Sequence, residues 1–255
     1  MKRNHANITQ YLYLVALIVF SGPLAIAADR EVEHANAQSD SSNLLIDIEK
    51  CRLSGYSVLF DIMEGSKRVG KASRTLTTAD KLTQLSSHVE ASIAFLSFTQ
   101  SEQSTLDDYP SAGFASNQYL KSRKKPLSKT KTTKFSIAQN SLPNGKAKHA
   151  IFDPLSVYDH LRELVCSGLK QDLALEVQEE TEIQRYYFEY RGLQQLQQGN
   201  ITKDAILMVR TRPASSRETF VWFDTNNRFL PIKIEQEKNG KTQATLVAHT
   251  ATATQ

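Results

Sequence analysis

The stretch 217–250 constrains the fold most, because its apolar and polar residues alternate. In its middle run, every second residue from Leu230 to Ile234 is apolar. A period of two gives one apolar face and one wet face, as a half-buried antiparallel strand requires. Two turn signals, at 224–228 and at the Asn-Gly pair 239–240, separate three such runs. The pattern predicts a β-meander.

Further short runs of this kind follow one another along the chain, separated by turn residues. They lie at 55–62, 67–77, 81–91, 113–124, 132–138, 173–179, 183–191 and 200–211. Because the runs are ordered as hairpins, they predict an antiparallel sheet rather than βαβ units. The apolar run 93–98 departs from strict alternation and predicts a bent or bulged connection. The fold class is therefore mainly β, with about ten strands.

One segment has the pattern of a substantial helix. Asp153 is a favoured N-cap and Pro154 fits the first turn, where a missing N–H leaves no bond unmade. Gly168 supplies the left-handed residue that commonly ends a helix. The apolar stripe between them has the three-to-four spacing of one helix face and comprises Leu155, Tyr158, Leu161 and Val165. The sequence therefore predicts one central helix among the strands.

The first 27 residues have the pattern of a secretory signal peptide. Lys2 and Arg3 precede an uncharged apolar stretch at 11–20, and small residues occupy the positions that a signal peptidase reads. We expect cleavage after Ala27 and export. A signal anchor is the alternative, but the apolar stretch is short for a membrane-spanning helix.

The remaining chain divides simply. No later apolar run approaches the roughly 20 residues of a transmembrane helix. The predicted organisation is a signal peptide at 1–27, a flexible polar leader at 28–50, a single β-rich domain at 51–250 and a tail at 251–255. The mature protein should be soluble.

The charge balance does not indicate a nucleic-acid partner. Without Lys2 and Arg3, 31 basic residues become 29 against 27 acidic ones, a net charge of about +2. One basic run contains no acid and comprises Lys121, Arg123, Lys124, Lys125, Lys129, Lys131 and Lys134. It fits anionic lipid headgroups or another polyanion, or a solvated hairpin whose lysines protect a sheet edge. The second interpretation is favoured, because the aromatic residues of a nucleic-acid site are missing.

Two cysteines, Cys51 and Cys166, remain after export. In an oxidising compartment they can form one disulfide, which would close a loop of more than 100 residues and stabilise the fold by about 4 to 5 kcal/mol in the chain-entropy model. The alternative is two separately buried thiols, since cysteine packs as a small apolar residue. The sequence leaves both open, and the spacing matches no metal or redox motif.

Catalytic and metal-binding patterns are weak. Ser156 and His160 share a helix face with Asp159 nearby, but no nucleophile elbow surrounds the serine. His88 and Glu90 share a strand face and would need a third ligand for zinc, so a cross-strand hydrogen-bonded or charged pair is the simpler interpretation. The acidic run 176–182 resembles a wet turn more than a glycosidase pair. No Gly-rich phosphate loop is present. We expect no enzyme activity, no cofactor and no metal site.

Four segments taken together resemble the bacterial exported-protein family known as domain of unknown function 3108. They are 56–76, 87–98, the Phe-Asp-Pro-Leu-Ser-Val-Tyr segment at 152–158 with the Leu-Arg pair at 161–162, and 222–235. The resemblance spans about 55–248. It implies a curved antiparallel sheet forming a partly open half-barrel, similar to periplasmic lipoprotein carriers, in a periplasmic protein without known catalytic residues. The Lys-rich region and the two cysteines depart from the family pattern.

A curved, incompletely closed sheet leaves a concave face that one helix covers only in part. Candidates to line it are Phe95, Leu96, Phe98, Tyr186, Phe188, Trp222 and Leu230. If the face is hollow it suits an acyl chain or another lipid-like apolar ligand; the alternative is that these residues fill the core. We therefore expect a non-enzymatic cell-envelope protein that binds such a ligand. The other candidate is a scaffold that docks on an envelope protein or anionic surface, through a sheet edge or the Lys-rich hairpin 121–134.

Overall fold

The computed structural model describes residues 51–79, 82–93, 96–109, 112–137, 139, 150–213 and 215–254. The predicted signal peptide and leader lie outside these residues. The strands are β1 (Gly55–Glu64), β2 (Lys67–Ala79), β3 (Leu82–Ile93), β4 (Leu96–Tyr109), β5 (Gly113–Lys124), β6 (Lys131–Ser136), β7 (Ile151–Phe152), β8 (Leu173–Glu179), β9 (Glu182–Gln198), β10 (Ile201–Thr211), β11 (Arg217–Asp224), β12 (Pro231–Lys238) and β13 (Lys241–Thr254). One helix, α3 (Val157–Cys166), lies between β7 and β8 within the described chain.

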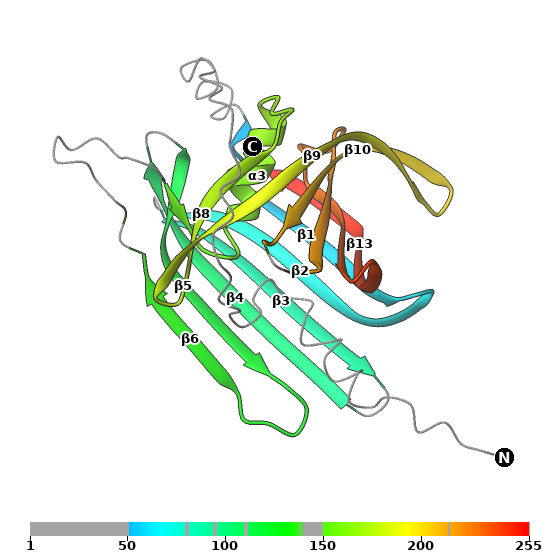
Figure 1. Cartoon of the computed structure of the whole chain (residues 1–255), viewed down its shortest axis with the longest axis horizontal. Helices are drawn as coiled ribbons and strands as arrows, with labels where there is room; N and C mark the ends of the chain where they lie inside the picture. Colours follow the sequence, from blue (N-terminus) through cyan, green and yellow to red (C-terminus); the bar gives the residue numbers. More distant parts are fainter. Residues whose placement is uncertain are drawn as a thin grey trace.

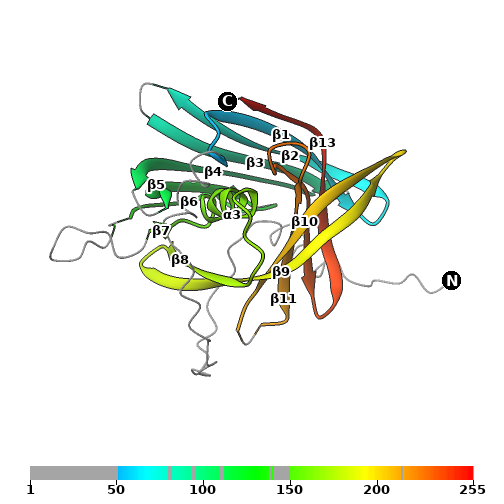
Figure 2. The same cartoon turned by 90° about the horizontal axis from the view of Figure 1, so that it is seen from above.

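All strands belong to one sheet in the order β6-β5-β4-β3-β2-β1-β13-β12-β11-β10-β9-β8-β7. Every pairing is antiparallel except that of β7 with β8, which is parallel. The sheet curves strongly, so that β1–β6 and β8–β13 face each other across α3 (Figures 1 and 2). It is not closed, because β6 and β7 remain its two edges. The prediction of a mainly β, curved and open sheet is confirmed, but about ten strands was too few.

The closing meander is confirmed. Strands β11, β12 and β13 pair in order, and Asn239 and Gly240 both adopt the left-handed φ that a tight hairpin turn needs. Strand β13 continues to Thr254, which pairs with Gly55 of β1. The tail predicted at 251–255 is therefore wrong over residues 251–254. These residues belong to β13, the last strand, which pairs with the first strand, β1.

Strand β4 has no apolar alternation that would predict it from the sequence, because its inward-facing residues are polar. Gln100, Glu102 and Ser104 are all nearly or fully buried, and they occupy the positions where an apolar alternation would have marked a strand. The bent connection expected at 93–98 is also wrong. Strand β4 begins at Leu96, which pairs with Ile93 of β3, and the pairing of the two strands continues from there without a register shift.

The predicted N-cap is wrong, because helix α3 begins at Val157 with Ser156 at the N-cap position, and Asp153 instead organises the turn before it. The Asp153 carboxylate accepts hydrogen bonds from the N–H groups of Leu155 and Ser156, at 2.7 and 2.9 Å. Gly168, with φ of +100°, ends the helix as predicted. The N–H of Leu169 reaches back to the carbonyl of Leu164 at 3.0 Å, as in a Schellman motif.

The helix is buried on all sides, not on one stripe. Every residue of Val157–Val165 is buried, and the apolar ones join one large cluster with inward-facing residues of the sheet. Figure 2 shows α3 enclosed by strands on both sides. Asp159, His160, Arg162 and Glu163 are therefore buried too, and buried charges need partners.

A side chain bridges the open seam of the sheet. The Gln139 amide donates to the carbonyls of Ser116 on β5 and Ile151 on β7, at 2.6 and 3.0 Å. Its oxygen accepts from the N–H of Ile151 at 2.9 Å. One amide group thus makes the bonds that a neighbouring strand would make, and it ties the two ends of the sheet together.

The structure decides between the two alternatives for the cysteines. Cys51 and Cys166 form a disulfide with a Cα–Cα distance of 5.8 Å across 115 positions of sequence. The bond joins the segment before β1 to the last turn of α3. Arg162 strengthens this junction by donating to the carbonyl of Cys51 at 2.9 Å.

Replacing Cys51 and Cys166 together by Ala should lower the free energy of unfolding by about 2 to 5 kcal/mol. The unfolded chain is then no longer closed into a loop by the disulfide, so its conformational entropy rises. Urea denaturation under oxidising conditions measures this change. Reduced wild-type protein should match the double variant, and equal stability of the oxidised and reduced wild-type forms would contradict the prediction.

Candidate functional site

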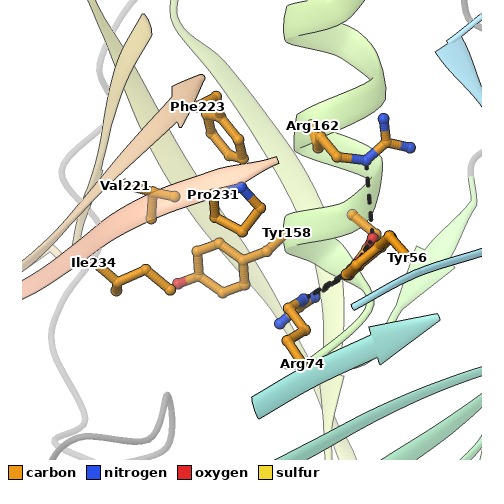
Figure 3. Close-up of a pocket in the computed structure, with 9 residues that line it drawn as sticks. Tyr56, Arg74, Tyr158, Arg162, Val221, Phe223, Pro231 and Ile234 are labelled. Carbon is orange, nitrogen blue, oxygen red and sulfur yellow. Dashed lines mark hydrogen bonds and ion pairs between the residues drawn. The ribbon is translucent and has the colours of Figure 1, made fainter. Parts of the chain in front are cut away.

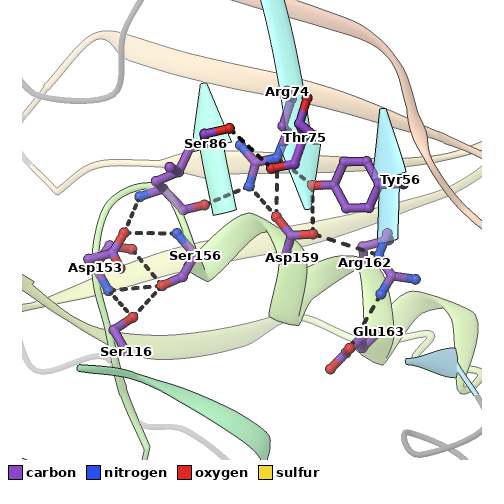
Figure 4. A network of polar contacts seen from close by, with 11 residues as sticks. Tyr56, Arg74, Thr75, Ser86, Ser116, Asp153, Ser156, Asp159, Arg162 and Glu163 are labelled. Atoms are coloured by element: carbon purple, nitrogen blue, oxygen red, sulfur yellow. Dashed lines mark hydrogen bonds and ion pairs between the residues drawn. The ribbon is translucent and has the colours of Figure 1, made fainter. Parts of the chain in front are cut away.

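An ion pair fixes α3 to the inner face of the sheet. Arg74 of β2 donates to both the Asp159 carboxylate of α3 and the carbonyl of Leu155, the latter at 2.7 Å. The Tyr56 hydroxyl donates to Asp159 at 2.7 Å and accepts from Arg74 at 2.9 Å (Figure 4). Burial raises the pKa of the Tyr56 hydroxyl well above its usual value, so it stays a donor. These groups close a fully buried network.

The interior beside this network is packed. Tyr158 extends from α3 toward Ile234, with Arg74 below it and Val221 and Phe223 on the facing strand (Figure 3). The free volume between them is about 10 Å³. That is room for one water molecule at most. This part of the concave face offers no space for a ligand.

A true hollow lies farther along α3. It is a cleft of about 670 Å³ at the end of the sheet where β2 meets β3 and β4 meets β5. Four apolar residues form its floor: Leu53, Leu76, Leu106 and Phe114. The polar members of its wall and rim are Arg52, Ser54, Thr78, Thr83, Asp107, Asp108, Asp159, Arg162 and Glu163. A cleft of this size accommodates a small molecule.

The most perturbed group in this cleft is Glu163. Its side chain is 3% exposed, and burial raises the pKa of its carboxyl from 4.5 to about 7, against the opposing effect of Arg162. One carboxylate oxygen accepts from Arg162 at 3.3 Å, while the other has no hydrogen-bond partner among the described residues. Buried carboxyl groups with shifted pKa values are typical of binding sites.

The wall at 51–54 depends on the disulfide. Cys51 is bonded to α3, and Arg52 next to it forms an ion pair with Asp108 of β4 at 3.1 Å. Leu53 then turns into the apolar floor. The two cysteines therefore shape the cleft, a role that their sequence spacing does not indicate.

The residues that could have formed a hydrolytic site are engaged elsewhere. Ser156 shares its hydroxyl with Ser116 and the N–H of Asp153, as Figure 4 shows. His160 stacks on Phe152 with ring centroids 4.5 Å apart, and burial lowers its pKa from 6.5 to about 3. With Asp159 bound to Arg74, these three side chains do not form a triad.

The aromatic and aliphatic residues predicted to line a ligand cavity do not lie in this cleft. Phe98, Tyr186, Phe188 and Leu230 belong to the main core, and Leu96 is half-buried. Phe95 lies outside the described residues. Trp222 joins a smaller cluster with Leu207 and Ile232, and it faces away from its neighbour Val221, which lies in the main core. None of the six described residues lines the cleft.

The predicted basic set divides into two environments. Lys121 is buried beside Glu102, at 3.5 Å, and burial lowers its pKa. Arg123 is half-buried. The remaining members are exposed on the β5–β6 hairpin and at the sheet edge, as edge protection requires: Lys124, Lys125, Lys129, Lys131 and Lys134.

The cross-strand pair expected at His88 and Glu90 forms between Glu90 and Lys71 of β2, while His88 pairs with Glu90 within β3. His88 and Glu90 lie 3.0 Å apart, and Lys71 of the neighbouring strand joins Glu90 at 3.3 Å. Among the described residues, no group of three His, Cys, Asp or Glu side chains is arranged to hold a metal ion. The same residues contain no helix long and apolar enough to cross a membrane.

The architecture is that of an open, β-barrel-like sheet wrapped around one helix. It is similar to the crystal structure of a β-barrel-like protein of a domain of unknown function, DUF1849, from Brucella abortus, with a TM-score of 0.48 and 8% identity, over 80% of this chain and 99% of that chain. No family model and no curated protein matches the chain. The similar structure belongs to a different domain of unknown function from the one that the sequence resembles. At this similarity it carries no argument about activity.

Asp159→Ala should lower the free energy of unfolding by about 3 to 5 kcal/mol, because it leaves the Arg74 guanidinium buried without its carboxylate. The double variant Arg74→Leu with Asp159→Leu should lose less than the single one, since no unpaired charge remains. Urea denaturation gives both values. A double variant that loses as much as the sum of Arg74→Leu and Asp159→Leu made separately would show that the two groups do not act as a pair.

Two buried groups of α3 should give opposite pH dependence. Between pH 3 and 6.5 the unfolded chain binds a proton at His160 that the folded chain does not, so stability rises with pH. Between pH 4.5 and 7 the folded chain holds a proton on Glu163 that the unfolded chain has lost, so stability falls with pH. Each slope is up to about 1.4 kcal/mol per pH unit.

Unfolding curves from pH 4.5 to 6.5 separate these contributions. Relative to wild type, Glu163→Gln should show a steeper rise of stability with pH, and His160→Phe, which can still stack on Phe152, should show a fall. Variants whose stability runs parallel to that of wild type would refute the shifted pKa values.

Proposed function

We propose that this protein is a non-enzymatic, exported envelope protein that binds an amphipathic, lipid-like ligand in the cleft between α3 and the ends of β2–β5. The observation that carries the proposal is the cleft itself: about 670 Å³, with a buried apolar floor and charged groups at its wall and rim. Small-molecule sites combine apolar surface with polar groups that fix orientation, and this cleft has both, with four apolar residues in its floor and nine polar ones at its wall and rim.

Export to the periplasm is part of the proposal. The signal-peptide pattern of residues 1–27 supports it. The Cys51–Cys166 disulfide supports it as well, because disulfides persist in oxidising compartments. The second candidate, a scaffold that docks through a sheet edge or the Lys-rich hairpin, has only the exposure of those lysines in its favour, which edge protection also explains.

Thr83→Trp should block the cleft. Thr83 lies at its rim, at the start of β3, where an aromatic residue suits a strand. Titration with the neutral apolar dye N-phenyl-1-naphthylamine should give saturable fluorescence enhancement with wild-type protein and at least about tenfold weaker binding with the variant.

The matched control is Thr202→Trp on β10. Both threonines make an exposed side-chain hydrogen bond across a hairpin, at 3.1 Å for Thr83 and 2.8 Å for Thr202, so both variants lose the same kind of contact. Only Thr83 lines the cleft. Absence of saturable dye binding to wild type, or equal binding by both variants, would overturn the proposed site.

A further inference from the structure

At its polar end, the cleft is lined by more acidic than basic side chains. Four carboxylates line it, from Asp107, Asp108, Asp159 and Glu163, against the two guanidinium groups of Arg52 and Arg162. The apolar floor adjoins this end, so a ligand with an apolar body would place its head group among these charges.

Three of the four carboxylates are already matched. Asp107 accepts from the Asn117 amide at 2.6 Å, Asp108 pairs with Arg52 at 3.1 Å, and Asp159 belongs to the Arg74 network. Asp107 and Asp108 are moreover exposed, so water satisfies them at little cost.

Glu163 is matched through one oxygen only, which accepts from Arg162 at 3.3 Å. Its side chain is as buried as that of Asp159, yet one of its carboxylate oxygens has no hydrogen-bond partner among the described residues. Leaving a buried acceptor unsatisfied costs about 1 to 3 kcal/mol, and more for a charged group. Such a group in a native structure calls for a missing donor.

The missing donor has a defined chemistry. A carboxylate that is ionised accepts hydrogen bonds only, so its complement is a donor, and a cationic donor makes the stronger bond. A carboxylate or phosphate head would instead meet the excess of acidic groups. We propose that the ligand of the cleft is an amphipathic primary amine whose ammonium group binds Glu163, with its apolar chain on the Leu53–Phe114 floor. This inference rests on the proposed function and specifies its ligand class.

The protonation of Glu163 would then control binding. The charged groups that act on it are Arg162 and Asp159 of α3 and Arg52 of the segment before β1, with Asp107 and Asp108 of β4 at the same cleft. An alkylammonium keeps its proton throughout the neutral range, as a lysine side chain does. With the Glu163 pKa at about 7, amine binding should strengthen about tenfold from pH 6 to pH 8.

Three probes with one chain and different heads test the inference: n-octylamine, n-octanol and n-octanoate. Their competition with N-phenyl-1-naphthylamine at pH 8 gives three affinities for the wild-type protein. The amine should bind about tenfold or more tightly than the alcohol, since a hydrogen bond to a charged group is worth about 1.5 to 3 kcal/mol. Octanoate should bind most weakly.

Glu163→Gln keeps the size of the side chain and removes its charge. This variant should bind octanol as wild type does but lose both the preference for the amine and its pH dependence. The matched control is Glu182→Gln, the same substitution at an exposed position in the β8–β9 hairpin, which should keep both. Circular dichroism before titration checks that each variant is folded. The comparison of the three probes on wild-type protein tests the inference even if a variant does not fold.

Each outcome decides the question. Equal affinities of wild type for the three probes would overturn the amine inference, since water would then satisfy Glu163, while the proposed apolar cleft would stand. Tightest binding of octanoate would also overturn it and point to the two arginines. If neither the dye nor any octyl probe binds, the proposed function fails together with the inference.

Discussion

The buried ion pair between Asp159 of α3 and Arg74 of β2 is the interaction that allows the sheet to wrap around the helix. Helix α3 brings four ionisable side chains into the interior, and the desolvation of each would outweigh the gain from the apolar contacts if none had a partner. The sheet supplies Arg74 and Tyr56 at the place where Asp159 arrives, and the carbonyl of Leu155 accepts a further hydrogen bond from Arg74. The helix is thereby fixed in depth and rotation, and the surrounding apolar residues can pack against it.

The position of the helix determines where the interior is full and where it is hollow. The face of α3 that carries Tyr158 fills the space toward β11 and β12, so that a free volume of only about 10 Å³ remains there. Its Glu163 side faces the ends of β2–β5, and there the wall comes from the segment that the disulfide holds. The cleft therefore results from three constraints together: the ion pair that sets the helix, the crosslink that sets the wall, and the hairpin ends that set the rim.

The concave surface is more polar than a simple carrier cavity. Tyr119 donates to Glu102, which also pairs with Lys121, while Arg210 lies over the ring of Tyr186, 3.1 Å from its centroid. Such satisfied groups inside a sheet restrict it to one arrangement, because any slip would bury unpaired charges. They also explain β4, whose inward-facing residues belong to this polar interior and carry no hydrophobic alternation.

The sequence by itself determined the local features: the hairpin order of the strands, the closing meander with its Asn-Gly turn, and a helix ended by Gly168. These depend on alternation, capping and left-handed glycines, which act between residues close in the chain. Only the tertiary structure decided that Cys51 meets Cys166, that Arg74 meets Asp159 across 85 positions, and that the hollow is lined by Glu163 and not by the predicted Tyr186, Phe188 and Trp222. Pairings at that distance follow from how the sheet curves around the helix, and no periodicity in the sequence encodes the curvature.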